Sequence, residues 1–252
     1  MPDDVKPVKT ETSLRTACQP FWTPMFGPPP YPMVRAEMLM VEFEADRAEI
    51  ERITPAPFEP APHNRLIAFI ADNFQPPITM EFHEAAILQP VRFGGREALT
   101  IPYIWVSNDT AMIAGRDLYG MSKMLCDHEK LQKVGNEVSG KAHRYGNLLY
   151  ELSMATHAHC PPTESPLIPE FAFLRHIPSP DPERPALQQL VWASLTDFQC
   201  EMCLRGRGWM RVGNPMNSAI DRLAPKAVTG AWYGTFSWVL GDGKILHEQH
   251  VW

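Results

Sequence analysis

The sequence predicts a mostly β fold of the α+β class, with antiparallel sheets or a barrel and a few flanking helices. Many short apolar runs are bounded by glycine, proline or asparagine turns, a pattern typical of strands. The 252 residues include 26 prolines but 15 glycines, which indicates short elements joined by rigid loops. Strand-like and helix-like runs do not alternate regularly, and this disfavours a parallel doubly wound sheet.

The first half of the chain begins with an arm. Residues 1–33 are polar and then proline-rich, so we expect an extended arm, and residues 34–252 then form a single domain. Residues 34–43 predict a strand, and residues 44–53 predict a short helix that Pro55 ends. The next apolar runs are separated by Pro76-Pro77, Gly94-Gly95 and Asn108-Asp109 and predict strands; they cover residues 66–74, 78–88, 98–107 and 110–114.

The second half continues the strand pattern. Residues 131–160 contain strand-like runs with turns at Gly135-Asn136 and Gly146-Asn147, and residues 215–223 resemble a helix. Gly241-Asp242-Gly243 predicts a turn that joins the last two strands into a pair. The later strands are predicted over residues 171–177, 186–204, 230–240 and 244–251.

Composition and missing motifs exclude several classes of function. A net charge of −6 argues against a protein that coats nucleic acid, and no apolar run approaches the roughly 18 residues of a membrane span. The N-terminus has no apolar run behind its charges, so it is not a secretory signal and we expect a cytoplasmic protein. The sequence has neither a Gly-x-Gly-x-x-Gly nor a P-loop motif, and no cofactor is predicted.

The cysteines and histidines do not predict a metal site. The five cysteines form no small-scaffold pattern and indicate reduced thiols. Cys200 and Cys203 form a lone C-x-x-C pair without a second pair to complete a zinc site, so we interpret them as structural. On a strand, His157 and His159 share one face while Cys160 points away, which leaves too few ligands for a metal.

The most informative segment surrounds Lys123. This lysine lies among apolar side chains, including Leu118, Met121 and Leu125. One interpretation is a surface lysine whose stem covers an apolar patch. The other is an amine removed from water, which loses its charge more readily and can attack a carbonyl carbon.

The segment Gly115-Arg116-Asp117 to Lys123 resembles the catalytic motif of the acetoacetate decarboxylase superfamily, Gly-Arg-Glu followed by Tyr/Phe-Pro-Lys-Lys. Lys123 falls on the first lysine of that motif. The resemblance extends in register over roughly residues 35–250. The further matching positions are Glu84, Phe93, Gly95, Asn108, Phe173 to Pro178, Trp209, Ala224-Pro225 and Gly243 to His250.

The resemblance implies a cone-like antiparallel β-barrel in which Lys123 forms a Schiff base with a keto acid. Glu84 corresponds to an active-site acid of the family, and the family's N-terminal arginine falls within a residue of Arg35. The sequence also departs from the family pattern. Met124 replaces the second lysine, Ser122 replaces the proline before the first, and a second family glutamate falls near Ile70.

These features predict a cofactor-independent lyase that forms an imine at Lys123 with a small 2-oxo acid. Glu84 would shuttle a proton, Arg35 or Arg116 would pair with the substrate carboxylate, and Met124 would contact the substrate. Because Met124 removes a cation, the sequence favours aldolase-dehydratase or hydratase chemistry. Decarboxylation of a β-keto acid through the same imine is the first alternative, and a non-catalytic binding protein is the second.

We also expect a homo-oligomer. The arm segment from Pro20 to Pro30 carries more aromatic and apolar groups than a segment free in water usually has. A neighbouring subunit or the arm's own subunit could cover it.

Overall fold

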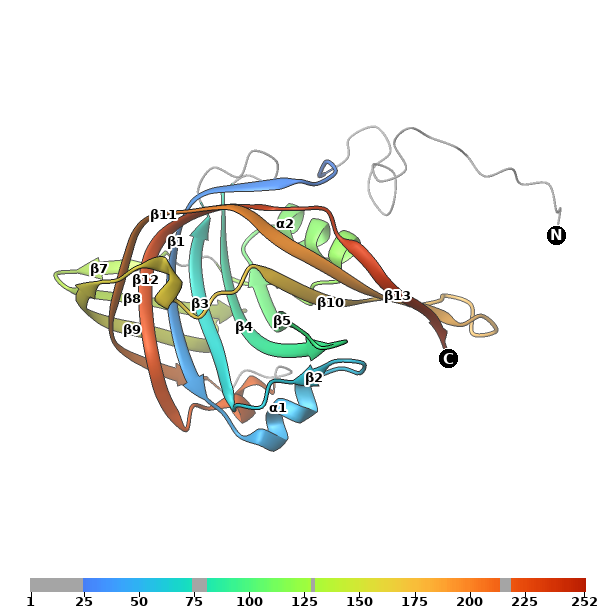
Figure 1. Ribbon diagram of the computed structural model, residues 1–252, viewed down its shortest axis with the longest axis horizontal. Coiled ribbons are helices and arrows are strands. Elements are labelled where there is room, and N and C mark those ends of the chain that lie inside the picture. Colours follow the sequence, from blue (N-terminus) through green and yellow to red (C-terminus); the bar gives the residue numbers. More distant parts are fainter. Residues whose placement is uncertain (1–24, 74–80, 128–129, 214–218) are drawn as a thin grey trace.

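The computed structural model describes residues 25–73, 81–127, 130–213 and 219–252. Their strands form one sheet in the order β10-β5-β4-β3-β1-β12-β11-β9-β8-β7, and β10 also pairs with β11, so part of the path closes into a barrel (Figure 1). Most pairings are antiparallel, which confirms the predicted fold class; β5 pairs in parallel with β6 and with β10. The strands are β1 (Tyr31–Glu44), β2 (Glu59–Pro60), β3 (Arg65–Asn73), β4 (Phe82–Phe93), β5 (Arg96–Val106), β6 (Lys123–Leu125), β7 (Gln132–Val134), β8 (Glu137–Arg144), β9 (Asn147–His159), β10 (Glu170–Ile177), β11 (Ala186–Val212), β12 (Ala227–Leu240) and β13 (Lys244–Val251).

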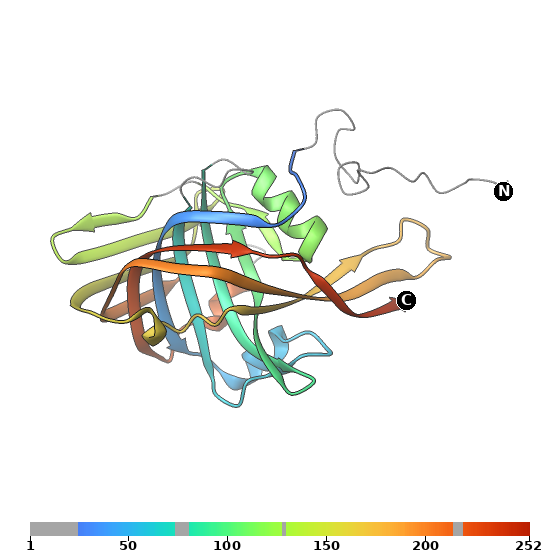
Figure 2. The same cartoon turned by 45° about the horizontal axis from the view of Figure 1, so that its top comes forward.

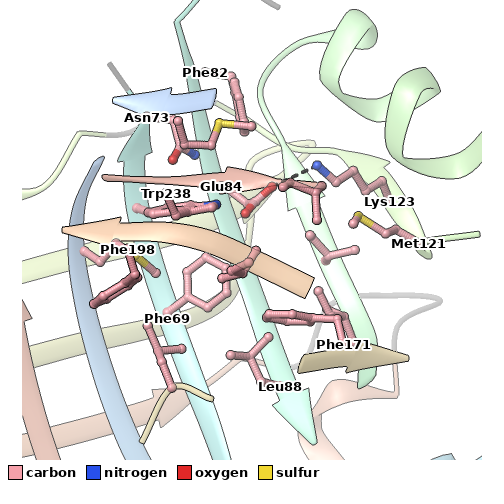
Figure 3. Close-up of a pocket in the computed structure, with 18 residues that line it drawn as sticks. Phe69, Asn73, Phe82, Glu84, Leu88, Met121, Lys123, Phe171, Phe198 and Trp238 are labelled. Carbon is pink, nitrogen blue, oxygen red and sulfur yellow. Dashed lines mark hydrogen bonds and ion pairs between the residues drawn. The ribbon is translucent and has the colours of Figure 1, made fainter. Parts of the chain in front are cut away.

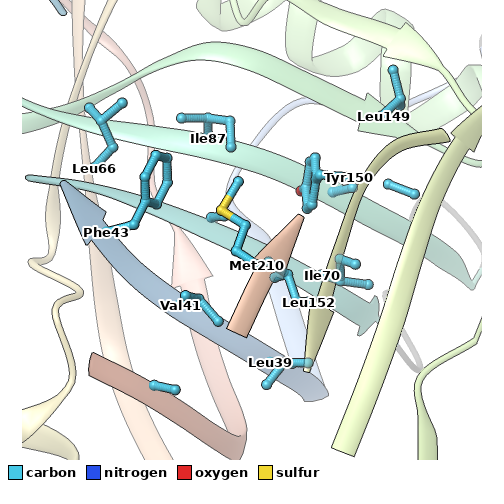
Figure 4. Close-up of a cluster of buried hydrophobic side chains, with 14 of the residues drawn as sticks. Leu39, Val41, Phe43, Leu66, Ile70, Ile87, Leu149, Tyr150, Leu152 and Met210 are labelled. Atoms are coloured by element: carbon cyan, nitrogen blue, oxygen red, sulfur yellow. The ribbon is translucent and has the colours of Figure 1, made fainter. Parts of the chain in front are cut away.

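Strands β1, β3 and β4 are buried on both faces, because they separate two apolar clusters. On β1, Leu39 and Val41 face one cluster while Met38 and Met40 face the other. The first cluster fills the space between these strands and β9 (Figure 4). The second surrounds the cavity described below.

The two α-helices are short, and a side chain caps the first turn of each. Asp46 caps α1 (Arg47–Ile53), so the helix predicted from residue 44 begins at Arg47. The strand predicted over residues 110–114 is wrong, because Asn108 Oδ1 accepts a hydrogen bond from Ala111 N at 2.8 Å and starts helix α2 (Asp109–Ala114). A π-helical turn, η2 (Gly115–Tyr119), continues α2. Two 3₁₀ turns are η3 (Pro162–Glu164) and η4 (Ile220–Leu223).

The last two strands do not form the predicted pair. Strand β12 pairs with the middle of β11, and β13 pairs with the beginning of β11. The chain between them therefore continues along β11 instead of reversing, and Gly241 N donates to Ser194 O at 3.2 Å. Strands β10, β11 and β13 extend from the barrel as a ribbon that ends near the C-terminus (Figures 1 and 2).

The predicted arm overlaps the first strand. Strand β1 begins at Tyr31, and the Tyr31 hydroxyl donates to the carbonyl oxygen of Gly27. Residues 1–24, which carry most of the predicted arm, lie outside the described residues. The predicted helix at 215–223 is described from residue 219, where η4 begins at Ile220. Within the described ranges, no helix is long and apolar enough to cross a membrane.

Tyr150 links three strands of the barrel. The residue is fully buried. Its hydroxyl donates to the carbonyl oxygen of Phe69 on β3 at 2.6 Å and also lies 3.3 Å from the carbonyl oxygen of Ala86 on β4.

We expect Tyr150→Phe to lower the free energy of unfolding by about 1–2 kcal/mol, because buried carbonyls lose a donor. Urea unfolding measures this. Tyr145→Phe is the control, since Tyr145 is 80% exposed and should change stability by less than about 0.5 kcal/mol. Equal effects of the two changes would contradict the assignment.

Candidate active site

Two adjacent strands form one wall of a cavity, because alternate side chains of each strand point into it. Antiparallel register places Ala71 opposite Glu84 and Asn73 opposite Phe82, and paired residues share a face of the sheet. The cavity lies in the second apolar cluster, and further lining side chains come from β1, β5, β10, β11 and β12 (Figure 3). From β3 and β4, the lining residues are Phe69, Ala71, Asn73, Phe82, Glu84 and Leu88.

Lys123 enters this cavity from β6, where it pairs with Ile104 of β5. Its Nζ atom lies 2.9 Å from Glu84 Oε2, and the two side chains are 8% and 15% exposed. The Nζ atom also lies 5.5 Å from the centre of the Phe82 ring, an arrangement that favours a cation. Burying one charge alone would be costly, so each group makes the burial of the other possible.

The rest of the lining is almost entirely apolar. Among the described residues that line the cavity, the polar side chains besides Lys123 and Glu84 are Asn73 and the indole of Trp238. Neither an arginine nor a second lysine belongs to this described lining. The apolar members are Met33, Met38, Phe69, Ala71, Phe82, Leu88, Ile101, Ile104, Met121, Leu167, Phe171, Leu195, Phe198 and Leu240.

Residues of the η2 turn contact the stem and the backbone of Lys123 and hold the side chain in place. A Cβ atom on Gly115 would lie 2.7 Å from Lys123 Cδ and 2.8 Å from Cε, so the lysine stem crosses this residue because glycine has no side chain. Arg116 Nη1 donates to the carbonyl oxygen of Lys123 at 3.0 Å. Burial raises the pKa of Asp117, while Arg116 and Arg175 act in the opposite direction. Gly115 and Arg116 thus fix the stem and the backbone carbonyl of Lys123.

A family model described as acetoacetate decarboxylase (ADC) matches residues 18–250. The chain belongs to the acetoacetate decarboxylase family. Acetoacetate decarboxylase 1 of Bradyrhizobium diazoefficiens is 25% identical over 249 residues, covering 96% of this chain and 97% of the relative. Acetoacetate decarboxylase 3 of Mesorhizobium japonicum is 22% identical over 240 residues, covering 93% and 91%.

Several solved structures share the fold. The acetoacetate decarboxylase of Legionella pneumophila superposes with a TM-score of 0.81 at 18% identity, over 97% of this chain and 99% of that one. The enduracididine biosynthesis enzyme MppR, in complex with the condensation product of pyruvate and imidazole 4-carboxaldehyde, gives a TM-score of 0.77 at 21% identity over 90% and 92%. These likenesses confirm the family's barrel.

The structure brings together Lys123 and Glu84, which the resemblance to the family had paired. Both arginines predicted to bind a substrate carboxylate lie elsewhere. Arg35 sits at a bulge of β1 with a positive φ of 57°, and its exposed side chain pairs with Glu201 at 2.7 Å. Arg116 is exposed, contacts the backbone carbonyl of Lys123, and does not line the cavity.

Met124 also lies away from the cavity, and so do Ile70, where the family's second glutamate falls, and the nearby carboxylate of Asp72. Successive residues of a strand point to opposite faces, so Met124 packs against the first apolar cluster while Lys123 faces the second. A lysine at position 124 would therefore point away from Lys123 Nζ. Ile70 belongs to the same first cluster. Asp72 is buried on that side, where it contacts His83 and accepts a hydrogen bond from Leu131 N at 3.1 Å.

Sequence reasoning missed Asn73, Phe198 and Trp238 as lining residues. Asn73 could have been predicted from the sequence. It is two residues from Ala71, which pairs with Glu84 on the next strand, so Asn73 and Glu84 lie on the same face of the sheet. Phe198 and Trp238 come from β11 and β12, whose approach to β4 depends on the closure of the barrel. No local pattern in the sequence reports that contact.

The close contact at Gly115 predicts that a single methyl group will disturb Lys123. Gly115→Ala should reduce borohydride-trapped imine at Lys123 about 10- to 100-fold, because small misplacements of a reacting group are costly. Gly115 has an ordinary helical φ of −65°, so the change adds no backbone strain. Gly27→Ala is the control, since nothing lies within 4 Å of a Cβ there. Unchanged trapping in Gly115→Ala would show that the lysine stem adapts.

The orientation of Met124 predicts that restoring a lysine there does not activate the site. Met124→Lys should lower the free energy of unfolding by about 1–2 kcal/mol, because a charge replaces an apolar contact with the first cluster. Trapping at Lys123 should stay unchanged. Met124→Leu, which keeps the contact, serves as the control. A tenfold gain in trapping or turnover in Met124→Lys would contradict the orientation described.

Proposed function

We propose that this chain is a lyase that forms an imine between Lys123 and the ketone carbon of a β-keto acid, and that it releases carbon dioxide. The observation that supports the proposal most directly is the Lys123–Glu84 pair inside an apolar cavity. Attack on a carbonyl needs the free amine, and Glu84 lies within hydrogen-bond distance to take its proton.

The imine supplies an electron sink. Lys123 Nζ attacks the ketone carbon and water leaves, which gives a protonated imine. The bond from the α-carbon to the carboxylate then breaks, carbon dioxide leaves, and the electron pair passes to nitrogen as a neutral enamine forms. Protonation of the enamine carbon and addition of water release the ketone and free Lys123. Glu84 is the nearest group that can carry these protons.

The apolar lining favours decarboxylation among the reactions open to an imine. Before carbon dioxide leaves, the adduct carries a cation and a carboxylate; afterwards both charges are gone. An ionised carboxylate is costly in apolar surroundings, so the surroundings favour the step that removes it. A 2-oxo acid in an aldol reaction keeps its carboxylate throughout, and the described lining offers no arginine to pair with it.

The sequence favoured aldol chemistry because Met124 replaces a lysine. That reason depends on a lysine at position 124 facing the substrate, whereas Met124 packs on the opposite side of β6. Aldol condensation stays as the second candidate, because the similar fold of MppR holds a condensation product of pyruvate. Water addition to an unsaturated 2-oxo acid would need the same carboxylate partner.

Imine formation is tested by trapping. Incubation with acetoacetate and borohydride should add the reduced substrate or its ketone product to the peptide that contains Lys123, and Lys123→Arg should abolish the adduct. Lys133→Arg is the matched control, because Lys133 is half-exposed and pairs with Glu37 at 2.9 Å outside the cavity. An adduct on Lys133, or none with acetoacetate or pyruvate, would reject the proposal and favour a non-catalytic binding protein.

The reaction type is tested by its products. Carbon dioxide should be released from a β-keto acid, and Glu84→Gln should slow release by roughly 10²- to 10⁴-fold. In this variant the Lys123 imine should form more slowly but still be trapped after long incubation. Pyruvate with an aldehyde should give little product. If the pyruvate condensation is faster than carbon dioxide release, the second candidate replaces the first.

A further inference from the structure

The cavity continues well beyond the reactive pair, and its character changes along its length. Glu84 and Leu88 both line it from β4, and four residues of a strand span about 13 Å. Near Glu84 the cavity contains the charged pair and Asn73. Toward Leu88 the labelled side chains are apolar, with Phe69, Leu88 and Phe171 on the side of the cavity away from Asn73 (Figure 3).

Strand register places these three side chains together. Phe69 pairs with Ala86, midway between Glu84 and Leu88. Phe171 of β10 pairs with Leu99 of β5, which in turn pairs with Pro90 of β4, so Phe171 lies level with a position two residues beyond Leu88. These three side chains, Phe69, Leu88 and Phe171, define an apolar extension of the cavity. It offers more room than the methyl group of acetoacetate would fill. Charged or strongly polar groups would enter it without partners among the described lining residues.

We infer that the preferred substrate is a β-keto acid whose ketone carbon carries an apolar alkyl or aryl substituent longer than methyl. This inference rests on the proposed function. When Nζ of Lys123 bonds to the ketone carbon, the carboxylate side of the substrate occupies the polar end beside Glu84 and Asn73. The substituent on the other side of that carbon extends along the apolar extension, where each added methylene is buried away from water.

A homologous series tests the inference on the unmodified protein. The straight-chain β-keto acids with four, five and six carbons are compared by carbon dioxide release. kcat/KM should rise about fourfold per added methylene, from the usual gain of a buried methylene, and thus more than tenfold from four to six carbons. The six-carbon β-keto diacid, which ends in a carboxylate at the same length, should react no faster than acetoacetate.

One variant and its control locate the effect. Phe171→Leu opens the far end of the apolar extension, so it should raise kcat/KM for the seven- and eight-carbon β-keto acids relative to the six-carbon acid. Phe43→Leu is matched in residue type and burial but lies in the first cluster, so it should leave the profile unchanged. If the variants do not fold, the series on the unmodified protein decides by itself.

The outcomes separate the two claims. If acetoacetate forms the Lys123 adduct and reacts as fast as its longer homologues, the inference is overturned while the proposed function stands. Equal rates for the six-carbon acid and diacid would also overturn it. If no β-keto acid gives an adduct, both fail.

Discussion

The buried ion pair between Lys123 and Glu84 is the interaction on which the rest of the site depends. Each charge is removed from water, and each would be costly without the other. Such pairs contribute little net stability compared with apolar packing, whereas removing one partner is destabilising by about 3–5 kcal/mol. The pair therefore requires a scaffold that holds two different strands, β4 and β6, at a fixed separation.

The barrel provides that separation through backbone pairing. Strand β5 lies between β4 and β6, so Glu84 and Lys123 project into one space from the two neighbours of a common strand. Gly115 and Arg116 add local control of the lysine stem and carbonyl. Gly115 and Arg116, at the start of the motif, thus support Lys123 from outside the cavity lining.

Lys123 and Glu84 were expected at one site because both match positions of the family, Lys123 within its motif and Glu84 in register outside it, and the structure brings the two side chains together. The sequence also predicted most strands, since their apolar runs are bounded by turn residues. Helix α2 was missed because the short apolar run from residue 110 was read as a strand although Asn108 acts as a cap. Arg35, Arg116 and Met124 were expected at the substrate but do not belong to the described lining of the cavity. Arg116 and Met124 are close to Lys123 in the sequence yet face away from the cavity, whereas the Arg35 side chain is exposed at a bulge of β1. Phe198 and Trp238 reach the cavity only through long-range closure of the barrel.

The central claim is that an amine at Lys123 and the Glu84 carboxylate act together inside an apolar cavity. The most direct measurement is a crystal structure of the protein after borohydride reduction with a six-carbon β-keto acid. We expect a secondary amine at Lys123 Nζ, Glu84 within hydrogen-bond distance of it, and the alkyl chain against Phe69, Leu88 and Phe171. An unmodified Lys123, or an alkyl chain directed into solvent, would contradict it.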